Sequence, residues 1–137
     1  MQNTIVFKAG DDNCLQVFHV DSFDMACPAS DGACDIEFDS SLDDKTVLIN
    51  VASPGGSVSI NDIGAMHVNT RTISSILWNF YGDDIDVTLC GGFGGPQFAG
   101  SVLIPHGNLE MKCPGLDGRV MVGGNVVQNK AHSEFHA

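Results

Sequence analysis

The stretch SILWNFYGDDIDVTLCGGFGG, residues 75–95, contains the only Trp and the only Tyr of the chain, beside three aspartates and a cysteine. ILWNF at 76–80 places Trp78 and Phe80 on one side of an extended strand, and IDVTL at 85–89 does the same for Val87 and Leu89. The intervening YGDD is typical of a turn, and GGFGG gives the backbone freedom for a tight corner. The stretch therefore predicts a strand, a turn and a second strand.

Short β-branched runs of the same kind recur along the whole chain. They lie at residues 4–7, 15–20, 34–38, 46–51, 57–60, 101–104, 108–111, 119–122 and 125–127, and Gly, Asp, Asn or Pro bounds each of them. This pattern predicts an all-β fold. One short helix is expected around residues 61–68, where apolar residues are loosely spaced for one helical face.

The strand centres of the second half have a coarse rhythm. Between Val87 and Leu109 there are 22 positions, between Val102 and Val120 there are 18, and between Leu109 and Val126 there are 17. A spacing near twenty favours a right-handed β-helix, or solenoid, of irregular coils that stack parallel strands. A β-sandwich built from the same short strands remains the alternative.

Length and charge restrict the classes of function. The chain has 137 residues, and we expect one domain spanning residues 1–137. Of its 17 acids 14 are Asp, and the net charge is −11, which disfavours binding to nucleic acid. No apolar run approaches the roughly 20 residues of a membrane-spanning helix, so we do not expect a membrane-embedded protein.

Five cysteines suggest a disulfide framework. In an oxidising compartment the expected pairs are Cys27 with Cys34 and Cys90 with Cys113, which leaves Cys14 unpaired. Cys90 and Cys113 are about one coil apart, as a bond between stacked coils requires. Reduced, buried thiols in a cytosolic protein are the alternative.

Residues 15–136 resemble the choice-of-anchor A domain, a surface-adhesive domain of secreted proteins. LQVFHVD, KTVLINV, ILWNF, GGF and GSVLIP occur in the order and spacing of that family. The most specific positions are Trp78, Asn79, Phe80, Gly91, Gly92, Phe93 and Pro105. The family domain extends further upstream than Gln16, so part of its N-terminal region is expected to be missing or rebuilt. The resemblance implies an extracellular, β-helical adhesive or structural domain without a known reaction.

The acids permit two kinds of chemistry that we weigh against solvated turns. Asp83, Asp84 and Asp86 can offer hard oxygen ligands to calcium, although they follow neither the EF-hand nor the nonapeptide spacing. A catalytic pair needs a desolvated setting that nothing in this turn indicates. His132 and His136 lie on one face of an extended strand about 13 Å apart, too far for a shared zinc.

The sequence thus predicts a non-enzymatic, secreted or cell-surface domain for adhesion or matrix structure. Its expected partners are an extracellular matrix protein, a glycan, or copies of itself that assemble into fibres. No cofactor is expected, calcium being the one possible ion. A carbohydrate-active β-helix lyase or hydrolase is the alternative. Ice binding is disfavoured, because Thr-x-Thr occurs once only, in the TRT at 70–72.

Overall fold

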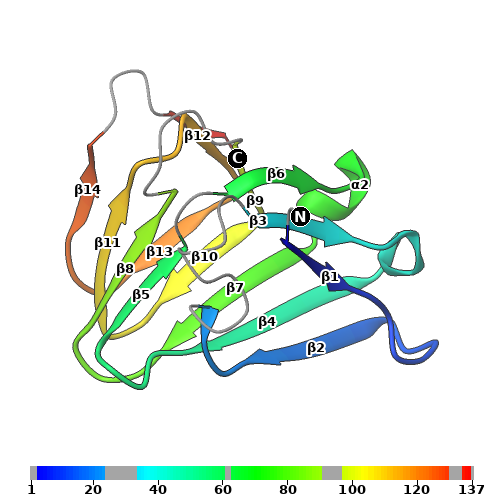
Figure 1. Cartoon of the computed structure of the whole chain (residues 1–137), viewed down its shortest axis with the longest axis horizontal. Helices are drawn as coiled ribbons and strands as arrows, with labels where there is room; N and C mark the ends of the chain where they lie inside the picture. Colours follow the sequence, from blue (N-terminus) through cyan, green and yellow to red (C-terminus); the bar gives the residue numbers. More distant parts are fainter. Residues whose placement is uncertain (1–2, 24–33, 61–62, 91–96, 130–133, 137) are drawn as a thin grey trace.

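A computed structural model describes residues 3–23, 34–60, 63–90, 97–129 and 134–136 (Figure 1). Strands dominate this part of the chain, and the helices in it are short. The all-β prediction is confirmed. Five residues named in the sequence predictions lie outside the described residues: Cys27, Gly91, Gly92, Phe93 and His132.

The strands form four sheets. The large sheet has the spatial order β13 (Val120–Val122), β10 (Ser101–Ile104), β7 (Ile76–Tyr81), β4 (Thr46–Ala52) and β2 (Leu15–Val20). The four-stranded sheet has the order β14 (Val126–Gln128), β11 (Gly107–Met111), β8 (Ile85–Leu89) and β5 (Ser57–Ile60). The first three-stranded sheet has the order β1 (Asn3–Phe7), β3 (Cys34–Phe38) and β6 (Ile63–His67). The second has the order β15 (Glu134–His136), β12 (Gly115–Asp117) and β9 (Phe98–Ala99).

The chain visits these sheets in a repeating order. β4, β5 and β6 lie in the large, the four-stranded and the first three-stranded sheet in turn. β7 to β9, β10 to β12 and β13 to β15 repeat the order, with the second three-stranded sheet in third place. We call each such passage a coil. Every strand pair among the described residues is parallel, which rules out the predicted alternative of an antiparallel β-sandwich.

The two strands predicted in residues 75–95 exist as β7 and β8, but they pair with strands of other coils and not with each other. The YGDD segment between them is a corner from the large sheet to the four-stranded sheet (Figure 1). Asp84 there has a φ of 49°, in the left-handed region that Asp tolerates better than most residues. The predicted turn is confirmed, and it changes sheet.

Apolar residues of successive coils lie above one another in the core. Ile49 of β4 is in register with Trp78 of β7, which is in register with Val102 of β10, and all three are fully buried. The rings of Phe7, Phe23, Phe38 and Phe98 have their centroids 5.2–6.2 Å from that of Trp78. The indole Nε1 donates to the carbonyl of Ala99 at 2.9 Å, so the polar atom of this buried ring is satisfied.

The helix expected around residues 61–68 is wrong. Residues 63–67 form β6, which pairs in parallel with β3. Two short helical segments lie elsewhere in the described ranges, α2 (Thr70–Ile73) and the 3-10 turn η2 (Ser40–Leu42). Asn69 begins α2 by accepting a hydrogen bond from the backbone N–H of Arg71. The edge of β3 was open for another strand, and such a long-range pairing outweighs the loose helical spacing.

Tight corners keep the coils in contact, and two glycines provide a matched test. A Cβ placed on Gly107 would lie 2.1 Å from the carbonyl oxygen of Ile85 in the neighbouring coil, whereas a Cβ on Gly55 meets no atom within 4 Å. Gly107→Ala should lower the free energy of unfolding by about 1–3 kcal/mol, because backbone must move to admit the methyl group. Gly55→Ala should change it by no more than about 0.5 kcal/mol. Urea titrations that gave equal losses for both variants would contradict this packing.

Candidate functional site

The acids singled out in the sequence lie at the corner between β7 and β8. Asp83 and Asp84 are exposed in the turn, and Asp86 projects outward from β8, between the buried Ile85 and Val87. Asp84 and Asp86 line a hollow of about 470 Å³, together with residues of the two following corners: Pro105, His106, Gly107, Asn108, Gly123 and Gly124. The hollow therefore lies along the line where three successive corners stack on one another. We call it the corner seam.

Side chains that line the corner seam form hydrogen bonds between neighbouring coils. The side-chain amide of Asn108 donates to Asp86 at 2.8 Å, and its carbonyl oxygen accepts from the backbone N–H of Asn125 at 2.8 Å. The coils of β11 and β14 are joined a second time, because the side-chain amide of Asn129, after β14, donates to the carboxylate of Glu110 on β11. These bonds connect neighbouring coils on the outer side of the four-stranded sheet, so Asp86 has a structural partner.

No group of three or more His, Cys, Asp or Glu side chains in the described ranges is arranged to hold a metal ion. Asp84 and Asp86 line the same hollow, but they are not part of such a group. Calcium binding by these aspartates stays a prediction from the sequence.

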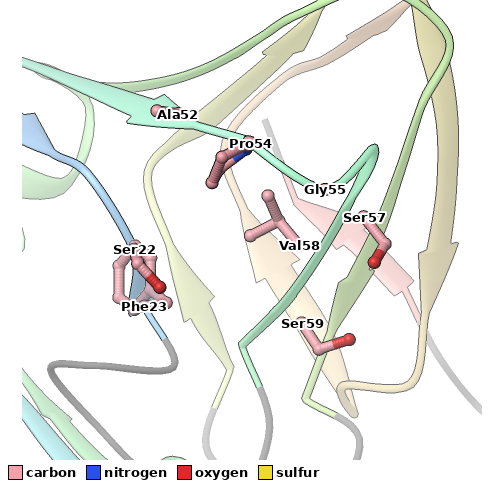
Figure 2. A pocket seen from close by; sticks show the side chains of 8 residues that line it. All are labelled: Ser22, Phe23, Ala52, Pro54, Gly55, Ser57, Val58 and Ser59. Atoms are coloured by element: carbon pink, nitrogen blue, oxygen red, sulfur yellow. The ribbon is translucent and has the colours of Figure 1, made fainter.

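A second, smaller hollow of about 160 Å³ lies beside the turn between β4 and β5. Figure 2 shows its lining: Ser22 and Phe23 after β2, Ala52 with Pro54 and Gly55 in the turn, and Ser57, Val58 and Ser59 on β5. The polar groups in this lining are hydroxyls and backbone atoms, and it contains no acid, base or thiol. This hollow offers hydrogen bonds and no proton-transfer group.

The disulfide between Cys90 and Cys113 is confirmed. It joins the residue after β8 to a residue shortly after β11, across a Cα distance of 4.8 Å. Because β8 and β11 are neighbours in one sheet, the bond links two successive coils. Cys34 is also disulfide-bonded, while its expected partner Cys27 lies outside the described residues. Cys14 is free and exposed, as expected for the odd cysteine.

Cys90, Cys113 and Cys14 allow a controlled stability test. Cys90 and Cys113 are 23 positions apart, and opening a loop of this size should cost about 3 kcal/mol of unfolding free energy in the chain-entropy account. The double variant Cys90→Ala/Cys113→Ala should show that loss in urea unfolding.

Cys14→Ala is the control for this loss, since a free, exposed thiol contributes little, and it should stay within about 0.5 kcal/mol of the parent chain. A Cys14→Ala variant as unstable as the double variant would refute the assignment of the stabilising bond.

The residues of the resembling motif divide between the inside and the outside of the large sheet. Trp78 and Phe80 are fully buried in the core, as predicted, whereas Asn79 points outward and donates to Asn50 of β4 at 2.8 Å. Pro105 is exposed at the corner after β10. The described motif residues are therefore two core side chains, an exposed corner and one outward amide.

The outer face around Asn79 is a surface that the sequence reasoning missed. Leu48 of β4 and Leu77 of β7 are in register there, half-buried, and outside the core cluster. The signal was present, because the outward positions of each strand in this sheet include no Asp, Glu, Lys or Arg. It could be recognised only once the strands were known to lie side by side in one sheet.

One histidine, His136, lies between two carboxylates on the outer side of the second three-stranded sheet. His136 has Nε2 2.9 Å from Oε2 of Glu134 and Nδ1 3.4 Å from Oδ1 of Asp117. The hydrogen bond to Glu134, with a smaller contribution from the charge of Asp117, raises the pKa of His136 above its usual 6.5, against a lowering by desolvation.

This raised pKa predicts a pH dependence with a definite sign. Protonated His136 is favoured in the folded chain, so its stabilising contribution is complete below pH 6.5 and disappears as pH rises through the raised pKa. An NMR titration should give His136 a pKa above 6.5, and Glu134→Gln should lower it. Glu110→Gln, in the four-stranded sheet, is the control and should leave it unchanged. Equal titrations in the parent chain and Glu134→Gln would refute the pairing.

Comparison with known proteins gives one positive finding. A family model described as "Putative Ice-binding-like adhesive domain" matches residues 1–137. Neither the curated proteins nor the solved structures contain a match to the chain. Within the described residues, no helix has the length and apolarity needed to cross a membrane.

Proposed function

The chain belongs to this adhesive-domain family, and on that premise we propose that it is a non-enzymatic extracellular domain for adhesion or matrix structure. The match over the whole chain is the observation that carries the proposal. It supports attachment to surfaces as the role, and the surface that we propose is a protein or a glycan. Ice binding stays disfavoured on the sequence argument, because ranks of Thr-x-Thr are missing from the sequence.

We infer that the fold is a right-handed β-helix of irregular coils, of the kind found in the choice-of-anchor A domain. The repeated order of the sheets and the parallel register of every described strand pair support this inference. The motif residues also support it, since Trp78 and Phe80 lie in the core where such a motif is structurally needed.

A non-enzymatic role is supported by the setting of the acids. Asp83 and Asp84 are exposed in a turn, and Asp86 accepts a hydrogen bond from Asn108 on a solvated face. General acid–base catalysis by carboxylates relies on an environment that separates their pKa values, such as a desolvated cleft. These residues instead have the surroundings of structural turn acids.

Secretion or display at a cell surface is supported by the disulfide chemistry. A bond such as that between Cys90 and Cys113, with Cys34 bonded as well, is typical of oxidising compartments. The free, exposed Cys14 is the exception in this framework.

Assembly with further copies is a second mode of attachment that we propose. Val126 and Phe135 are in register with the buried Leu109 and Leu116, yet their exposed fractions are 43% and 41%. β13, β14 and β15 form the outer edges of their sheets in the described residues. An additional strand, from the same or another chain, can pair at these edges and cover both side chains.

A retention assay tests the adhesive role. Beads carrying the oxidised, folded domain should be retained under flow on surfaces coated with collagen, fibrinogen, cellulose or chitin more strongly than beads carrying the reduced and denatured chain. Retention on none of these surfaces would overturn the adhesive proposal.

The same polysaccharides test the non-enzymatic role. Incubation with the domain should release no new reducing ends and no unsaturated products. Release of either product would establish the lyase or hydrolase alternative.

A further inference from the structure

We propose that the outer face of the large sheet, over β2, β4, β7, β10 and β13, is a docking surface for a protein partner with an apolar centre and a rim of lysine and arginine. The inference rests on the proposed adhesive function and adds to it one face and one class of partner. Figure 1 shows the strands of this sheet side by side, in the order that creates the face.

Two rows of side chains cross the strands at the centre of this face. Val17, Leu48 and Leu77 are in register on β2, β4 and β7 and form an apolar row. Neighbouring strands are about 4.8 Å apart, so these side chains are in contact along the row. Their outward direction follows from alternation, because the residues on either side of Leu48 and of Leu77 are buried in the core.

The second row combines amides with apolar groups. Asn50 and Asn79 are in register and joined by the 2.8 Å hydrogen bond, and Leu103 of β10 and Met121 of β13 continue the row. The bonded amide pair retains donors and acceptors that a partner can use. The face is thus largely apolar, with a small number of fixed polar groups, as in the centre of a protein interface.

Carboxylates, lysine and arginine are missing from the outward strand positions of this face in a strongly acidic protein, while His19 of β2 lies in register with Asn50 at the end of the second row. The outward positions of β2, β4, β7, β10 and β13 include no Asp, Glu, Lys or Arg, although the chain has a net charge of −11. The outer side of the four-stranded sheet, by contrast, presents Asp86 and Glu110. Depletion of charge at the centre of a surface patch is the compositional sign of a protein interface.

Exposed acids frame the uncharged centre at both ends of its strands. Asp12 and Asp44 precede β2 and β4, and Asp21, Asp83 and Asp84 follow β2 and β7. Two cations lie beside this frame: Lys45, whose ammonium group donates to the carbonyl of Asn13, and Arg119, which is exposed directly before β13. The five acids outnumber them. A basic rim on the partner complements these acids and speeds the encounter.

Two other partners fit this face less well: a second copy of the chain and a glycan surface. A second copy docked face to face would place the acidic rims of both molecules against each other, and like charges at such short range repel. A glycan surface is typically held by stacking of sugar rings on several aromatic side chains, whereas Tyr81 is the one aromatic residue at the outward positions of the large sheet's described strands. The buried Trp78 is unavailable for stacking.

The size of the face is compatible with the centre of an interface. Five strands span about 20 Å across the sheet and about 20 Å along it, or roughly 400 Å². A standard interface covers about 800 Å² on each partner, so the acidic frame has to be part of the contact.

Binding to a synthetic peptide tests this surface. The probe is an immobilised peptide with a Leu and Val centre flanked by lysines, and its controls carry Glu in place of Lys or Ser in place of Leu and Val. The parent chain should bind the probe and neither control. Leu77→Glu should weaken binding about tenfold or more, because it buries a charge at the centre of the contact.

Matched variants separate docking from folding. Ser59→Glu places the same new charge outward on β5, in the four-stranded sheet, and should change binding less than about twofold, within the noise of most affinity measurements. Leu77→Thr keeps a strand-forming residue and should also weaken binding if Leu77→Glu does not fold by circular dichroism. Asp44→Asn/Asp84→Asn should slow association and reduce its salt dependence, while Asn tolerates the left-handed backbone at both positions.

Each contrary result has a definite meaning. Parent-like binding by both Leu77 variants overturns the docking surface, even where beads still adhere to coated surfaces. Cellulose or chitin binding that needs Leu77, or dimerisation in the ultracentrifuge that Leu77→Glu abolishes, overturns the choice of partner. Failure of the parent chain to bind the peptide overturns the inference, and it overturns the adhesive function only if the bead assay fails as well.

Discussion

Parallel, in-register pairing between successive coils is the constraint on which the rest of this structure depends. It places a buried residue of one coil directly above a buried residue of the next, as with Ile49, Trp78 and Val102. The same register brings Asn79 to Asn50 on the outside, and Cys90 within bonding reach of Cys113 at the end of neighbouring strands. A shift of one residue in any strand would exchange its buried and exposed sides, so core, amide pair and disulfide all restrict the same alignment.

Stacking of this kind gives each outer face its own chemistry. The outer side of the four-stranded sheet has hydrogen bonds between coils, for example from Asn108 to Asp86, and the second three-stranded sheet has the pair of His136 and Glu134. The large sheet has apolar rows and an amide pair instead. For an adhesive domain this difference matters, because one face can be selected for contact while the acids on the others maintain solubility.

The sequence predicted a large part of the architecture from local patterns. Alternation identified both strands in residues 75–95 and the inward direction of Trp78 and Phe80, since period two fixes which side chains share a face. Spacing between strand centres indicated stacked coils, and the cysteine spacing indicated the bond from Cys90 to Cys113. The helix expected around residues 61–68 was wrong, because loose apolar spacing does not reveal the open edge of β3 with which those residues pair.

The candidate surface depended on information of a different kind. By itself the sequence determined the strand content, the excess of aspartate in turns, the odd Cys14 and the sides of individual strands, because these depend on residues close together in the chain. Only the tertiary structure decided that Val17, Leu48 and Leu77 form one row and that exposed acids frame it, because these residues come from different coils, about thirty positions apart, and meet only through the parallel register.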